Sequence, residues 1–257
     1  MMLKELEAAF KKKTLIPYFT YGDKSVEFSE KLVELAFDCG ADIVELGIPF
    51  SDPIADGPVI QASHTRALST DNVTLNMAFD SVNRLKNKYA KPIIFMVATN
   101  LVYQYGIEAF FKSAKNSKLN GVVIPDLPIE SAEPYIKAAK KNNVAIIFLV
   151  SPLCDEKRMQ KIVKSSTGFV YLISSTGTTG ERASLSSQLG GISKKIKLIK
   201  SIPVAVGFGI STPEQVKEVY QYADGAIIGS HLVKCIDERD QKDIISDIKL
   251  KLTALIK

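Results

Sequence analysis

Short apolar segments alternate with longer amphipathic segments along the chain. The apolar segments are rich in Ile, Val, Leu and Phe, and they show no clean alternation of apolar and polar positions. This pattern is typical of parallel strands that are buried on both faces. The predicted strands cover residues 15–20, 42–47, 92–97, 121–125, 145–150, 169–173, 204–208 and 225–228.

The segments between these strands have the length and the apolar periodicity of helices. The predicted helices cover residues 26–39, 73–89, 107–118, 130–142, 156–165, 193–201, 213–222, 232–237 and 241–256, and residues 1–13 show an amphipathic helical pattern. The sequence Ser211-Thr212-Pro213-Glu214 predicts a helix start, because a hydroxyl group can cap the first turn and proline suits the first helical position.

Strands and helices alternate eight times without a linker or a low-complexity gap. This alternation predicts the α/β class, with one (βα)8 TIM barrel domain over residues 1–257 and an extra N-terminal helix. The competing fold is a doubly wound open sheet, which usually has fewer strands. Its dinucleotide-binding fingerprint is missing, because Gly207-Phe208-Gly209 has no third glycine three residues further on.

Composition and charge narrow the function classes. Apolar residues make up 46% of the chain, which is enough for a sizeable core. The net charge of +5 comes from lysines that are mixed with acidic residues and not interleaved with aromatic ones, so no nucleic-acid partner is expected. Such a mildly positive field still suits an anionic substrate.

The cysteines and the apolar runs indicate the compartment. The three cysteines lie far apart and show no CxxC spacing, so a disulfide framework is not expected and a reducing cytoplasm is. The N-terminal segment does not resemble a signal peptide, and no apolar run is long enough to span a bilayer. We therefore expect a cytoplasmic protein without membrane association.

Two carboxylates are the candidates for proton transfer. Glu45 interrupts the apolar strand 42–47, and Asp56 ends the Pro-rich loop that follows; both lie on the side of the barrel where active sites are built. The histidines, His64 and His231, have no metal-ligand spacing, the GxSxG motif is absent, and lysines are missing from the strand ends. The alternative is that Glu45 is a buried structural acid and Asp56 a turn residue.

Glycine-rich segments follow the last three predicted strands, at 174–182, 207–211 and 229–230. The loops after the last two strands commonly bind phosphate in such barrels, although tight turns need glycine as well. The predicted loop 174–191 is long and rich in Ser, Thr and Gly, so it is either a lid over the substrate or a surface loop.

Longer motifs resemble one known family. The segment ELGIPFSDPIADGP at 45–58, together with PYFTYGD at 17–23, YLISSTGTTGERAS at 171–184 and GFGISTPEQV at 207–216, is similar to the α subunits of tryptophan synthase. The similarity extends from about residue 16 to 236. It implies a (βα)8 barrel that cleaves indole-3-glycerol phosphate to indole and glyceraldehyde 3-phosphate, a retro-aldol reaction that needs neither metal nor cofactor in this chain.

The resemblance also implies roles for particular residues. Glu45 and Asp56 match the catalytic glutamate and aspartate of the family. The substrate-binding positions of the family match Tyr18, Tyr171, Thr179, Gly180, Phe208, Gly209, Gly229 and Ser230. Departures from the family occur in the lid, which reads Ser175-Thr176-Gly177-Thr178 here, and at Tyr18, where phenylalanine is more usual.

A partner is implied as well. Family members work with a pyridoxal-phosphate β subunit in an α2β2 heterotetramer, and indole passes to that subunit for tryptophan biosynthesis. The loop that carries Asp56 and the segment 100–105 are the expected contacts. Three alternatives remain: a free-standing indole-3-glycerol-phosphate lyase, another phosphate-binding barrel enzyme, and a non-catalytic allosteric activator of a β subunit.

Overall fold

The computed structural model describes residues 2–54, 56–70, 73–173, 182–207, 209–236 and 239–256, and for residues 182–186 only the backbone. The described strands are β1 (Thr14–Thr20), β2 (Val44–Gly47), β3 (Ile93–Met96), β4 (Gly121–Val123), β5 (Ala145–Ile147), β6 (Leu149–Val150), β7 (Val170–Ile173), β8 (Val204–Gly207) and β9 (Gly225–Ile228). Their bounds lie within two residues of the predicted ones wherever the predicted residues are described.

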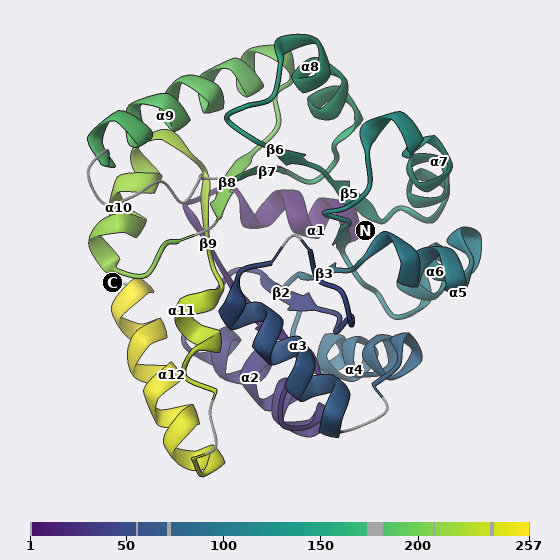
Figure 1. Ribbon diagram of the computed structural model, residues 1–257, viewed down its shortest axis with the longest axis vertical. Helices are drawn as coiled ribbons and strands as arrows, with labels where there is room; N and C mark the ends of the chain where they lie inside the picture. Colours follow the sequence, from purple (N-terminus) through teal and green to yellow (C-terminus); the bar gives the residue numbers. More distant parts are fainter. Residues whose placement is uncertain are drawn as a thin grey trace.

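The strands form a parallel sheet that closes on itself. Their order is β5-β4-β3-β2-β1-β9-β8-β7-β6, and each neighbouring pair is parallel. The two ends of this order, β5 and β6, belong to the single predicted strand 145–150, which is interrupted only at Phe148. The barrel therefore closes within this strand, and the (βα)8 prediction is confirmed (Figure 1).

Alternate strand residues supply two separate cores. Ile43 belongs to a cluster inside the barrel, whereas the adjacent Val44 and Leu46 belong to a larger cluster shared with the surrounding helices. Both faces of each strand are thus buried, which is why the strands read as continuous apolar runs. Because side chains alternate along a strand, Glu45 lies on the inner face, with Ile43.

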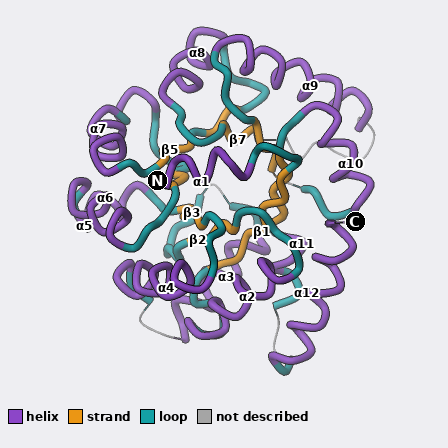
Figure 2. Tube along the Cα trace, turned by 180° about the vertical axis from the view of Figure 1, so that it is seen from behind, coloured by secondary structure: helices purple, strands orange, loops and turns teal. Residues whose placement is uncertain are grey.

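The helices form a ring around the barrel (Figure 1). They are α2 (Val26–Asp38), α3 (Pro58–Thr70), α4 (Leu75–Lys88), α5 (Thr99–Tyr105), α6 (Ile107–Asn116), α7 (Glu133–Asn142), α8 (Glu156–Ser165), α9 (Arg182–Ile199), α10 (Pro213–Tyr222), α11 (Ser230–Val233) and α12 (Gln241–Ile256), with a 3-10 turn η1 (Ile129–Ser131). The predicted extra helix is α1 (Met2–Ala9), which crosses one end of the barrel (Figure 2). The predicted start of α10 is confirmed by a capping box between Thr212 and Gln215.

Some helical predictions were wrong. The helices α3 and α5 were not expected, and α11 begins and ends earlier than the predicted helix 232–237. Helix α9 begins at Arg182, so residues 182–191 are helical and not part of a long loop. Its serines and its glycine pair at 190–191 lower the intrinsic helix propensity, but burial of Leu189 and Ile192 against the barrel overrides this effect. The proposed lid, 174–181, lies outside the described residues.

Across the part of the chain that the structure describes, no helix combines the length and the apolar character needed to cross a membrane.

Candidate active site

Glu45 lies on β2 with its side chain inside the barrel. In register it stands beside Tyr18 on β1 and Ile94 on β3, and its side chain is completely buried. Neither carboxylate oxygen has a hydrogen-bond partner among the described residues. A structural buried carboxylate is normally paired or hydrogen-bonded, so this arrangement favours a chemical role.

Burial decides the protonation state of Glu45. It raises the pKa of the carboxyl group to about 8, and the negative charge of Asp56 contributes in the same direction. Glu45 therefore carries its proton at neutral pH. A protonated carboxylic acid in an apolar environment is suited to act as a general acid.

Asp56 is brought to the same region by the loop after β2. This loop starts with a hydrogen bond from the backbone N–H of Ile48 to the carbonyl of Met96, 2.8 Å long, and turns back with a 3.0 Å bond from the N–H of Asp56 to the carbonyl of Pro53. The Gln61 side chain on α3 donates to the Asp56 carbonyl at 2.8 Å. Burial raises the pKa of the Asp56 carboxyl group to about 6, so it is mostly ionised at neutral pH.

Tyr18 and Tyr171 form part of the wall beside Glu45. Both side chains are buried, and burial raises the pKa of both hydroxyl groups well above the usual value, so both remain neutral. Each ring extends over a glycine on the neighbouring strand, Tyr18 over Gly47 and Tyr171 over Gly207. The two rings can take these positions because those glycines lack a side chain.

A cavity of about 290 Å³ lies at the C-terminal ends of the strands, where barrel active sites occur. It brings together predicted residues from five separate parts of the sequence: Tyr18, Asp56, Tyr171, Gly209, Gly229 and Ser230. It also contains residues that we did not predict: Gly57, Pro58, Ile60, Met96 and Ile227. Alternation along the predicted strands would have indicated Met96 and Ile227, whereas Ile60 belongs to the unexpected helix α3.

The predicted phosphate-binding positions lie at this cavity as far as they are described. Gly209 has a backbone φ of +81°, which glycine adopts without strain, and Gly229 and Ser230 mark the start of α11. No lysine or arginine lines the cavity in the described ranges, so backbone N–H groups are the available donors there. Thr179, Gly180 and Phe208 lie outside the described residues.

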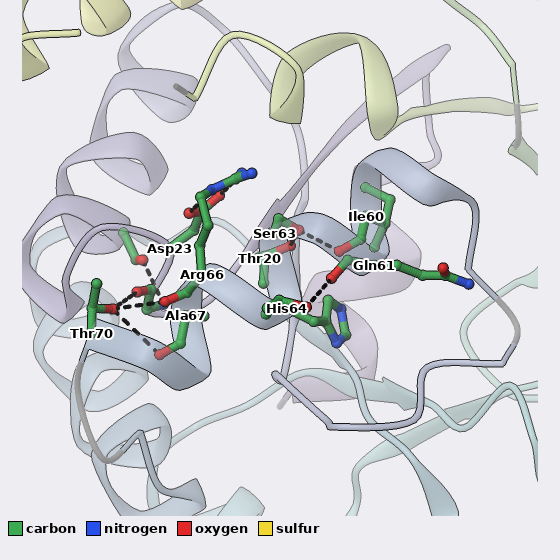
Figure 3. A network of polar contacts seen from close by, with 12 residues as sticks. Thr20, Asp23, Ile60, Gln61, Ser63, His64, Arg66, Ala67 and Thr70 are labelled. Atoms are coloured by element: carbon green, nitrogen blue, oxygen red, sulfur yellow. Dashed lines mark hydrogen bonds and ion pairs between the residues drawn. The ribbon is translucent and has the colours of Figure 1, made fainter. Parts of the chain in front are cut away.

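His64, on α3, is a further residue beside the site that the sequence analysis considered only as a metal ligand. Its Nε2 atom lies 3.3 Å from the Tyr18 hydroxyl oxygen and 3.8 Å from Oδ2 of Asp56. Figure 3 shows His64 beside Ser63, which contacts Thr20 of β1, while Arg66 further along α3 pairs with the buried Asp23. Within the described ranges, no group of three His, Cys, Asp or Glu side chains is placed to hold a metal ion.

Comparison with known proteins identifies relatives of the chain over nearly its whole length. The sequence model of the family "Tryptophan synthase alpha chain" matches residues 4–255. The tryptophan synthase alpha chain of Lacticaseibacillus casei is 42% identical over 243 residues, which are 94% of this chain and 91% of that protein.

Solved structures agree with this similarity. A chain of the tryptophan synthase complex from Pyrococcus furiosus superposes with a TM-score of 0.86 at 34% identity, covering 95% of this chain and 98% of that one. A second structure, described as the basis of mutual activation of the a2b2 complex from the same organism, gives a TM-score of 0.87 at 37% identity with the same coverage.

Proposed function

The chain belongs to the tryptophan synthase alpha chain family, and from that premise we propose which of its residues carry the family's reaction. As a member it is a lyase that catalyses the aldol cleavage of indole-3-glycerol phosphate to indole and glyceraldehyde 3-phosphate. It needs no cofactor itself, because the pyridoxal phosphate of tryptophan synthase belongs to the β subunit. We assign the proton transfers to Glu45 and Asp56.

Glu45 is the general acid and then the general base. Its proton goes to C3 of the indole ring, and the resulting carboxylate takes the proton of the hydroxyl group on the adjacent glycerol carbon. The carbon–carbon bond then breaks, its electron pair returns to the indole ring, and the oxygen becomes the aldehyde of glyceraldehyde 3-phosphate. The single observation that carries this assignment is the completely buried carboxyl group without a hydrogen-bond partner among the described residues.

Asp56 has the complementary role. Protonation at C3 places positive charge on the ring, and an ionised carboxylate next to the ring N–H stabilises that charge. The two carboxyl groups suit opposite roles because their environments separate their pKa values, about 8 for Glu45 and about 6 for Asp56. The neutral rings of Tyr18 and Tyr171 form the wall of the indole site.

The phosphate group binds where β8 and β9 end. We assign it to the backbone at Gly209, Gly229 and Ser230, which line the cavity together with Asp56. Backbone N–H groups in glycine-containing turns and at helix starts bind phosphate without a charged side chain. The matching positions Thr179 and Gly180 complete this assignment on the basis of the family motif alone.

A β subunit is the proposed partner, in an α2β2 assembly to which indole is passed directly. The Pyrococcus furiosus neighbour is part of such a complex. Two exposed large apolar side chains are Ile54, in the loop that carries Asp56, and Tyr103 on α5. Both lie in the segments where the family motif predicts contacts.

The test is indole release from indole-3-glycerol phosphate, with and without a β subunit, by the wild type, E45Q, D56N and the control E133Q. Glu133 is an exposed residue whose carboxylate pairs only with Lys137 among the described residues. We expect E45Q to lose at least about 10²-fold in kcat and E133Q to match the wild type. Near-full activity of E45Q would overturn the assignment, and stimulation of a β subunit by a chain that releases no indole would support the activator reading instead.

A further inference from the structure

We propose that His64 is a positioning residue for Asp56: its ring fixes the loop that carries Asp56 and presents an N–H group to the side of the carboxylate that faces away from the substrate cavity. The inference rests on the proposed role of Asp56 and adds a residue that the family motif did not indicate. It stands on three contacts of one buried imidazole ring, made to a loop backbone, a tyrosine hydroxyl and a carboxylate.

The first contact sets the tautomer of the ring. The backbone N–H of Phe50 donates a hydrogen bond to Nδ1 of His64 at 3.1 Å. An atom that accepts this bond cannot itself carry a proton, so the neutral ring holds its proton on Nε2. Burial lowers the pKa of His64, which keeps the ring neutral.

The second and third contacts show where this proton points. The Nε2 atom lies 3.3 Å from the Tyr18 hydroxyl oxygen and 3.8 Å from Oδ2 of Asp56. The first distance allows a weak hydrogen bond, while the second is too long for one and leaves an electrostatic attraction. The ring thus connects α3 with β1 and with both ends of the loop between β2 and α3.

The cavities show that His64 acts through Asp56 and not on the substrate. Asp56 and Met96 line the substrate cavity of about 290 Å³ and also a smaller cavity of about 30 Å³ under the loop. His64 lines only the smaller one. Asp56 therefore stands between the two cavities, with one side toward the predicted indole site and the other toward His64.

The chemical consequence follows from the charge of the carboxylate. An N–H group directed at one oxygen favours the ionised form and restricts rotation of the side chain, so the other oxygen is held ready for the indole N–H. Other titratable groups also face this region and contribute to any pH profile. Those that line the two cavities or act electrostatically on the buried groups there are Glu45, Tyr18, Tyr171, Asp52, Asp126 and Asp23, which is paired with Arg66.

Two variants separate the functions of the two ring nitrogens. In H64N the amide oxygen stands near the position of Nδ1 and can still accept from Phe50, but the side chain ends before Nε2. In H64Q the amide reaches the position of Nε2 and can still direct an N–H group toward Asp56, but the acceptor at Nδ1 is lost. A third variant, Y18F, removes the competing acceptor and leaves the Nε2–H group to Asp56 alone.

The experiment measures kcat and KM for indole release between pH 5 and 9, and the binding of indole against benzofuran, which lacks the ring N–H. We expect H64N to move the acid limb of kcat/KM to higher pH by about half a unit or more and to reduce the preference for indole over benzofuran. In H64Q the acid limb and the preference for indole should stay closer to those of the wild type. Y18F should move the acid limb to lower pH.

Urea unfolding establishes that each variant is folded. If H64N does not fold, the opposite shift expected for Y18F still decides the matter. The inference would be overturned if H64N and Y18F both keep the acid limb at the wild-type pH and both keep the wild-type preference for indole over benzofuran. The proposed function fails separately, if D56N itself keeps wild-type activity and wild-type preference for indole.

Discussion

The hydroxyl group of Tyr18 occupies the space in which the Cβ atom of any other residue would stand at Gly47. The same relationship joins Tyr171 and Gly207 on the other side of the barrel. Each tyrosine is thus held over a glycine at the end of the neighbouring strand. The glycine at 207, which the sequence analysis counted within a phosphate loop, has the separate task of making room for a ring.

The first prediction concerns these two glycines. G47A and G207A should each lower the free energy of unfolding by about 1–3 kcal/mol, because the added methyl group overlaps a buried ring that has little room to move. Both should also lower kcat/KM for indole release, since the displaced rings line the proposed substrate cavity. Urea unfolding and steady-state kinetics check the two effects.

G191A is the matched control for this prediction. Gly191 lies within α9, and a Cβ atom there would meet nothing within 4 Å. We expect this variant to keep full activity and to gain about 0.5–1 kcal/mol, the usual difference between alanine and glycine inside a helix. Equal destabilisation in all three variants would show that the tyrosine contacts are not the cause.

The second prediction is a bell-shaped pH dependence of kcat/KM. The proposed roles require Asp56 ionised and Glu45 protonated, so kcat/KM should rise through a pH of about 6 and fall through a pH of about 8. Because the Asp56 charge contributes to the raised pKa of Glu45, D56N should move the basic limb of its residual activity to lower pH. A basic limb that stays in place would mean that another group controls it.

The third prediction links Glu45 to stability. The pKa of Glu45 is about 8 in the folded chain and 4.5 for the free group, so the folded state retains a proton that the unfolded state loses. The contribution of Glu45 to stability is therefore complete below pH 4.5 and is lost as the pH rises toward 8, a change on the order of 4 kcal/mol.

E45Q removes this titration. The wild type should lose stability relative to E45Q between pH 5 and pH 8.5, as measured by urea midpoints at both values. The comparison uses the difference between the two pH values, so a constant cost of the buried amide cancels. Parallel pH dependence of the two proteins would indicate that Glu45 is solvated in the folded chain.

The sequence predicted the barrel well because the information is local. Buried parallel strands read as apolar runs, and alternation places residues 43 and 45 on the same face of their strand; which face is the inner one follows only from the fold. Helix α5 escaped prediction because its N-cap, Ala98, has no capping side chain, and the bond to its first N–H comes from Asp126, which is distant in the sequence. Gly190 and Gly191 concealed the first half of α9.

For the candidate site, the family motif predicted the roles of the residues, whereas the fold was needed to identify the residues that contact them. Glu45 and Asp56 are recognisable from the sequence as carboxylates in unusual positions, one within an apolar strand and one at the end of a Pro-rich loop. The contact of His64 with both Asp56 and Tyr18 was not, because it depends on the position of α3 against β1 and on the path of the loop between them. Such long-range geometry has no signature in the order of residue types.

The last prediction concerns the surface for the β subunit. Tyr103 on α5 leaves 70% of its side chain exposed and lines neither of the two cavities that contain Asp56. Tyrosine is one of the residues that most often anchor a protein–protein interface. Y103D should therefore weaken binding of a β subunit by at least about tenfold, while indole release by the chain alone stays at the wild-type rate.

The control is L250D, because Leu250 is equally exposed but lies on α12, away from the loops that carry the site. Titration of the β subunit, followed by the stimulation of indole release, measures both variants; equal weakening in the two would place the interface elsewhere or show that any new charge disturbs the assembly.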